Sequence, residues 1–254
     1  MPVLFVGHGN PMNAITDNPF ARGWKGMVEG VPRPETILCV SAHWDTRGVR
    51  VNTTSRPATI HDFRGFPPQL YDVNYPCPGS PEWSVEAARA VSMTSIQRDE
   101  DRGLDHGAWA VIKWMYPGAD VPVFQMSLDT SRSASFHYEL GRQLAPLRDR
   151  GVLLVGSGNM VHNLPLMDMN QGAAPYSWAV EVDGLMKKLI GSREHQRLID
   201  YDDLGPSARL AIPTPEHYLP LLTVLGATIE NEPLGFYNEQ IDLRSVSMTS
   251  LKIG

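Results

Sequence analysis

Three short apolar runs stand out in the pattern of hydrophobic and polar positions, because a histidine follows each of them. The runs are residues 3–7, 36–41 and 152–156. They are rich in Val, Ile and Leu, which is typical of central strands in a parallel sheet, buried on both faces. His8 and His43 come just after the first two runs, and His162 lies a few residues past the third. Since ligands of open α/β sheets bind beyond the carboxyl ends of the strands, we expect three imidazoles at one edge of one sheet.

The rest of the chain alternates between helical and extended patterns. Apolar spacing predicts helices at 18–29, 81–93, 108–116, 133–149, 178–190 and 215–225, and further strands at 49–53, 121–128 and 246–253. The strand at 49–53 is expected at an edge or in a hairpin. Residues 55–79 contain many Pro, Gly and aromatic residues and form a long loop, of a kind that is often functional. This order predicts an α/β fold, with residues 1–254 as a single domain built on a central, mainly parallel or mixed sheet flanked by helices.

Composition narrows the classes of function. The net charge of −6 and the lack of a basic block argue against nucleic-acid binding. No apolar stretch approaches the length of a membrane span, and the N-terminus lacks a basic leader, so we expect a cytoplasmic protein without membrane association. Cys39 and Cys77 lack the spacing of a disulfide or metal framework and are expected to be free thiols.

Four of the eight histidines are open to ordinary structural roles. His137 and His195 lie among charged neighbours on expected helices and are predicted to be solvated. His61, in the long loop, either covers a site or caps a turn. His106 precedes an expected helix, as a turn residue or as part of a pocket.

The other four histidines, His8, His43, His162 and His217, are the candidates for chemistry. A buried histidine with satisfied hydrogen bonds is the alternative for each one. However, Gly7 and Gly9 flank His8, and Ser41 and Ala42 precede His43, and such small residues let the backbone approach a ligand closely. Imidazole is also the commonest protein ligand of catalytic metals.

Five segments together resemble one known family. They are GHGNPM at 7–12, SAHW at 41–44, GLDHG at 103–107, SGNMVHN at 157–163 and PTPEHYLP at 213–220. In this order they resemble the DOPA-dioxygenase branch of the class III extradiol ring-cleavage dioxygenases, the superfamily of the protocatechuate 4,5-dioxygenase catalytic subunit. The similarity extends over essentially the whole chain.

The resemblance implies a role for each matching histidine. His8 and His43 match two metal ligands, and His217 matches the third. His162 matches the acid/base beside the metal and is a possible fourth ligand, and His106 matches a pocket residue facing the substrate. Other superfamily members use a carboxylate as third ligand, and Glu216 is adjacent to His217. Adjacent residues on a helix point about 100° apart, so we expect only His217 to bind the ion.

The resemblance also implies the reaction. One divalent metal is expected: Fe(II) for ring cleavage, with Zn(II) able to occupy the all-histidine site in purified protein. The substrates would be O₂ and a catechol such as L-DOPA, opened at its 4,5-bond to a muconic semialdehyde. Tyr218 and the loop 55–79 are the expected pocket walls. The alternatives are a zinc-dependent hydrolase with Glu216 as base, and a non-catalytic protein that binds metal or an aromatic ligand.

Overall fold

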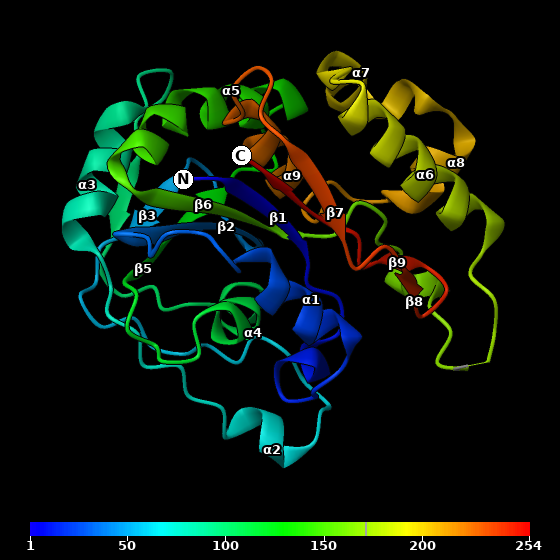
Figure 1. The fold of residues 1–254 in the computed structure, drawn as a ribbon, viewed down its shortest axis with the longest axis horizontal. Helices are drawn as coiled ribbons and strands as arrows, with labels where there is room; N and C mark the ends of the chain where they lie inside the picture. Colours follow the sequence, from blue (N-terminus) through cyan, green and yellow to red (C-terminus); the bar gives the residue numbers. More distant parts are fainter. Residues whose placement is uncertain (171) are drawn as a thin grey trace.

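The computed structural model describes residues 1–170 and 172–254, which form one large sheet between two layers of helices (Figure 1). The strand order is β4 (Gln97–Asp99), β3 (Arg50–Asn52), β5 (Val123–Leu128), β2 (Thr36–Asp45), β6 (Val152–Gly158), β1 (Val3–Gly7), β10 (Ser250–Ile253) and β7 (Leu234–Tyr237). The central strands β5, β2, β6 and β1 are parallel, whereas β10 pairs antiparallel with β1 and β7, and β3 with β5. The predicted mixed α/β architecture is confirmed.

Both faces of the central strands are covered, which explains their continuous apolar sequences. Successive side chains of a strand point to opposite faces. In β1, Val3 and Phe5 join the core beneath α5 (Ala134–Leu144) and α9 (Leu219–Gly226), while Leu4 and Val6 join the core beneath α1 (Pro19–Met27) and α4 (His106–Met115). Figure 1 shows these helix pairs on opposite sides of the sheet.

The parallel centre brings three carboxyl ends to one edge. In the register of the sheet, Gly7 of β1 lies beside Gly158 of β6, and Ser41 of β2 lies beside Ser157. The expectation that imidazoles from these strands lie at one edge of the sheet is therefore confirmed. His43 lies inside β2 rather than after it, where the pairing of β2 with β5 is irregular between Val40 and Asp45.

The remaining elements surround this centre. They are α2 (Pro68–Tyr71), α3 (Pro81–Ala90), α6 (Ser177–Gly191), α7 (His195–Ile199), α8 (Pro206–Ala211), the short pair β8 (Ile241–Asp242) and β9 (Val246–Ser247), and 3₁₀ turns η1 (Pro11–Ala14), η2 (Ala145–Arg150), η3 (Leu164–Leu166) and η4 (Tyr201–Leu204). None of the helices in the described part of the chain has the length and apolarity needed to cross a membrane.

Three sequence expectations about elements were wrong. The strand at 49–53 is neither an edge nor part of a hairpin, because β3 lies between β4, which pairs with it in parallel, and β5, which is distant in sequence. The final strand at 246–253 is divided into β9 and β10. At this division the hydroxyls of Ser247 and Thr249 donate hydrogen bonds to Asp183 Oδ1, at 2.6 and 2.8 Å; β9 pairs with β8, whereas β10 pairs with β1 and β7.

The third error matters most for function, because it concerns the segment that carries His217. Helix α9 begins at Leu219, not at Pro215. In a helix starting at 215, Pro220 would lie in the interior, where it has no N–H to donate and its ring clashes with the preceding turn. In the first turn of α9 the same proline is tolerated. His217 therefore lies in a turn, in which Pro215 C=O accepts hydrogen bonds from the backbone N–H groups of Tyr218 and Leu219.

Candidate functional site

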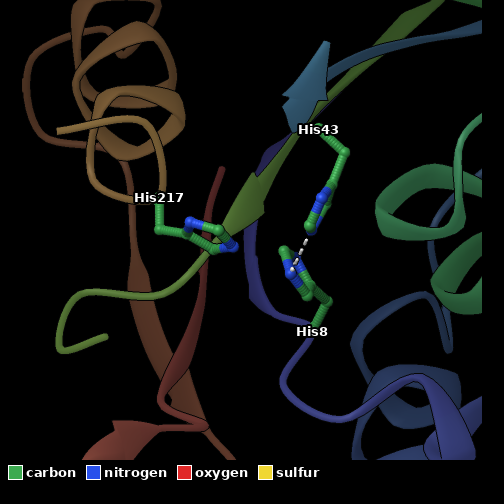
Figure 2. Close-up of side chains that lie close together, drawn as sticks. All are labelled: His8, His43 and His217. Carbon is green, nitrogen blue, oxygen red and sulfur yellow. Dashed lines mark hydrogen bonds between the residues drawn. The ribbon is translucent and has the colours of Figure 1, made fainter. Parts of the chain in front are cut away.

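Three histidines from distant parts of the chain point toward one another at the edge of the sheet (Figure 2). Ligand nitrogens of His8, His43 and His217 all lie within 4.8 Å of one another. His8 Nε2 and His43 Nε2 are 3.1 Å apart. Two nitrogens bound to one ion at about 2.1 Å stand roughly 3.0 to 3.4 Å apart when the angle between them is about 90° to 110°. The observed separation fits two ligands of a single metal ion.

The protonation of His8 follows from its partner. Ser157 Oγ lies 3.0 Å from His8 Nδ1 and donates its only proton to Gly107 C=O at 2.5 Å. The hydroxyl must therefore accept its second hydrogen bond from the Nδ1–H group of His8. This arrangement leaves the lone pair of Nε2 free and directed toward His43.

Carboxylates lie behind the other two imidazoles. Asp62 Oδ2 is 3.6 Å from His43 Nδ1, and Glu216 Oε1 is 3.1 Å from His217 Nδ1. A hydrogen-bond acceptor at Nδ1, as Glu216 is for His217, fixes the tautomer and leaves Nε2 for a metal. Asp62, at 3.6 Å, lies beyond hydrogen-bond distance of His43 and acts on it through its charge. Glu216 thus supports His217 from behind, in a turn rather than on the expected helix.

Burial favours the neutral form of all three rings. It lowers the pKa values of His8 and His43 well below the usual value, and the neighbouring imidazoles lower them further. Burial also lowers the pKa of His217, although Glu216 opposes the shift. Neutral imidazole is the form that binds a metal.

His162 lies directly against this cluster. Its ring stacks on that of His217, with 3.5 Å between centroids and 12° between planes. Its backbone N–H donates to Ala211 C=O, which ties the segment after β6 to α8. Burial, followed by the proximity of His217, lowers the pKa of His162 to about 3, so the ring is neutral near pH 7 and able to accept a proton.

His106 and Asp62 complete the polar part of the site. His106 is the first residue of α4 and is 5% exposed. Its backbone N–H and its Nδ1–H both donate to Asp62 Oδ1, at 2.9 Å each. Burial raises the pKa of Asp62, but the hydrogen bonds from His106 outweigh it and leave that pKa below its usual value.

A cavity of about 360 Å³ opens above the histidines, within the range of small-molecule sites. It is lined by His8, Gly9, Asn10, Pro11, His43, Asp62, Phe63, Phe66, His106, His162, Leu164, Met167, Met169, His217, Leu243 and Val246. The histidines and Asp62 supply most of the polar groups of the cavity, and most of the other lining residues are aromatic or aliphatic. The composition suits a planar aromatic ligand that presents polar substituents to the histidines.

Sequence reasoning missed Asp62, although the loop that carries it was expected to be functional. For the adjacent His61 the structure supports the turn-capping alternative, because its Nε2 lies 3.0 Å from Val73 C=O within the same loop. Phe63 and Phe66 confirm the loop as a pocket wall. Tyr218 does not line the pocket, because it is fully buried and its hydroxyl donates to Leu198 C=O.

Other expectations met mixed outcomes. Cys39 and Cys77 are free thiols, as predicted, and both are buried. The prediction that His137 and His195 are solvated was wrong. His137 is fully buried, with Nε2 3.0 Å from Asp129 C=O, and the half-buried His195 pairs with the Tyr138 hydroxyl at 2.9 Å. Charged sequence neighbours did not reveal which face of each helix is packed.

Comparison with known proteins agrees with this geometry. Residues 11–250, which include four of the five clustered histidines, match the family described as the catalytic LigB subunit of aromatic ring-opening dioxygenase. A 4,5-DOPA dioxygenase extradiol of Escherichia coli (strain K12) is 45% identical over 258 residues, covering 100% of this chain and 95% of that protein. Another from Beta vulgaris is 37% identical over 257 residues, covering 98% and 95%. The crystal structure of an uncharacterized protein from Escherichia coli K12 matches with a TM-score of 0.87 and 42% identity over 100% of both chains. The chain therefore belongs to the LigB family of aromatic ring-opening dioxygenases.

Proposed function

We propose that this protein is a metal-dependent extradiol dioxygenase that opens a catechol ring with O₂. The observation that carries the proposal is the convergence of His8, His43 and His217 at the floor of an aromatic-lined cavity, with nitrogen spacing that fits one ion. Family membership supports the same activity. It does not favour a zinc hydrolase or a purely binding protein on this scaffold.

His8, His43 and His217 are the proposed metal ligands. These three neutral imidazoles would hold the ion from one side, and the cavity beside them would leave room for further ligands. Fe(II), when bound, supplies the redox chemistry that allows a catechol and O₂ to react. The same nitrogen set suits Zn²⁺, so we expect zinc in protein that has not been loaded with iron.

His162 is the proposed acid/base. It does not belong to the group of His8, His43 and His217, but lies with Glu216 and His217 in a neighbouring group and stacks on the His217 ring. This placement favours proton transfer over a fourth metal bond. Its neutral ring can accept a phenolic proton as the catechol binds and return it as the ring opens, a role that requires hydrogen-bond reach to the substrate. His106, oriented by Asp62, is placed to hold a substrate hydroxyl.

The first test uses L-DOPA, because relatives of this chain are named for that substrate. Protein loaded anaerobically with Fe(II) and then exposed to air is expected to form a yellow ring-cleavage product from L-DOPA, with one O₂ consumed per ring. Zinc-loaded protein is the matched control and should form none. A lack of product from a panel of catechols, with iron shown to be bound, would contradict the proposal. Hydrolysis by the zinc form without O₂ would favour the hydrolase.

A second prediction concerns the close approach of β6 to the turn that carries His217. A Cβ at Gly158 would lie 2.1 Å from His217 C=O, which also accepts a hydrogen bond from Asn159 N–H. Gly158→Ala should therefore push the turn outward, lowering stability by about 1–3 kcal/mol, the usual cost of overpacking. The displaced ligand should also weaken zinc binding in chelator competition.

The control for this substitution is Gly184→Ala in α6, where an added Cβ meets no atom within 4 Å. Alanine is favoured over glycine inside a helix, so this variant should unfold at the same or a slightly higher temperature. If Gly158→Ala retained both the stability and the zinc affinity of the parent chain, the turn would not depend on this contact.

A further inference from the structure

One carboxylate spans two histidines of different proposed roles. Asp62 Oδ1 accepts hydrogen bonds from His106, while Oδ2 lies 3.6 Å from His43 Nδ1. Building on the function proposed above, we propose that Asp62 is a positioning residue. It sets the orientation of His106 toward the substrate and of His43 toward the metal.

The proposal rests first on proton placement. An ionised carboxylate can only accept hydrogen bonds. The Nδ1 atom of His106 must therefore carry a proton, so that Nε2 is the ring nitrogen left to face the substrate. The negative charge of the same carboxylate, 3.6 Å from His43 Nδ1, favours a proton at that atom, so that Nε2 is free where it lies 3.1 Å from His8 Nε2. Without Asp62, no carboxylate would favour a proton at Nδ1 of His106 or of His43.

The second support is that the residues on either side of Asp62 are packed against α4, although they lie in a long loop. Its neighbour Phe63 is 8% exposed, and the Phe63 ring packs edge-on against His106 with 5.5 Å between centroids. On its other side, Ile60 C=O accepts a hydrogen bond of 2.8 Å from Trp109 Nε1–H of α4. The carboxylate also meets the N-terminus of α4, where the helix dipole favours negative charge.

Two substitutions separate the two functions of the carboxylate. In Asp62→Asn the amide oxygen can still accept from His106, but the amide N–H groups face the Nδ1–H group of His43. Metal affinity is expected to fall by about 10–100-fold, as is typical for loss of an outer-shell partner, with a smaller change in the kcat of metal-saturated enzyme. In Asp62→Ala both contacts are lost, so kcat should fall as well, by roughly 10–100-fold, with little change in KM.

The measurements must distinguish positioning from a general structural role. Chelator competition with Zn²⁺, and the visible spectrum of the Co(II) form, report the metal site without any turnover. If Asp62 acts on turnover through His106, metal-saturated His106→Ala and the double variant Asp62→Ala/His106→Ala should have the same kcat. Asp72→Asn, an exposed carboxylate of the same loop, is the matched control and should match the parent chain.

Three results would overturn the proposal. In the first, Asp62→Ala has the metal affinity and kcat of the parent chain. In the second, the kcat losses of the two alanine substitutions multiply in the double variant. In the third, the parent chain binds two metal equivalents and Asp62→Asn one, which would make Asp62 a ligand. Failure of ring opening in iron-loaded protein would contradict the proposed function alone, because the zinc and cobalt measurements still test Asp62.

Discussion

Replacing His217 with alanine is expected to abolish high-affinity metal binding and, with it, ring opening. His217 is 7% exposed, and its ligand nitrogen lies within 4.8 Å of those of His8 and His43. Removal of this imidazole leaves only two of the three proposed ligand nitrogens and an empty space where the third ring was buried. The loss of metal affinity should therefore exceed the roughly 10–100-fold cost of removing an outer-shell partner. Zinc competition, iron content after reconstitution and catechol turnover are the measurements.

Glu216→Gln is the matched variant for this prediction. Glu216 Oε1 lies 3.1 Å from His217 Nδ1 and accepts from the Thr214 hydroxyl at 2.8 Å. Glutamine retains a neutral acceptor, so metal affinity should fall by at most about 10–100-fold. His195→Ala, outside the cluster, should bind metal like the parent chain. Metal lost from Glu216→Gln but retained by His217→Ala would show that the carboxylate is the ligand, as in other superfamily members.

Replacing His162 with alanine is expected to leave the metal in place while kcat falls by about 10²–10⁴-fold, the usual contribution of a general acid/base. The physical reason is its position. The ring lines the cavity and stacks on a proposed ligand at 3.5 Å between centroids, but it does not belong to the cluster of His8 and His43. Metal content and kcat, measured on the same preparation, test both parts.

Free imidazole provides a second readout for His162. The alanine substitution leaves space for a soluble imidazole beside His217, so added imidazole should restore part of the lost turnover in the His162→Ala variant. It should not do so in the parent chain. Loss of metal from the variant would instead identify His162 as a fourth ligand, and an unchanged kcat would remove it from the reaction.

Most strands of the sheet were predictable because the apolar residues that mark a buried strand are adjacent in the sequence. The apolar runs of β1, β2 and β6 identify buried strands by themselves, and parallel pairing then places His8, His43 and His162 at one edge. Weaker elements were missed or misplaced. The three residues of β4 are polar, and the strand exists because they pair beside β3.

The extent of α9 was also within reach of the sequence. Pro220 rules out a helix that begins at Pro215, since an interior proline has no N–H to donate. The apolar residues at 219–225 indicated a helix, and the start of that helix was placed too early because the position of Pro220 within it was not taken into account. The consequence is functional, because a turn, unlike a helix, lets Glu216 support the neighbouring His217 from behind.

The sequence by itself determined the buried strands, the order of the motifs and the identity of the five clustered histidines. Only the tertiary structure decided how they are supported. Asp62 contacts His106 across 44 residues of chain, and Tyr218, next to a proposed ligand, turns away into the core. Hydrophobic periodicity reports whether a segment is buried, which is a local property. The choice of which carboxylate reaches which imidazole depends on how a loop closes against a distant helix, and no local pattern encodes that contact.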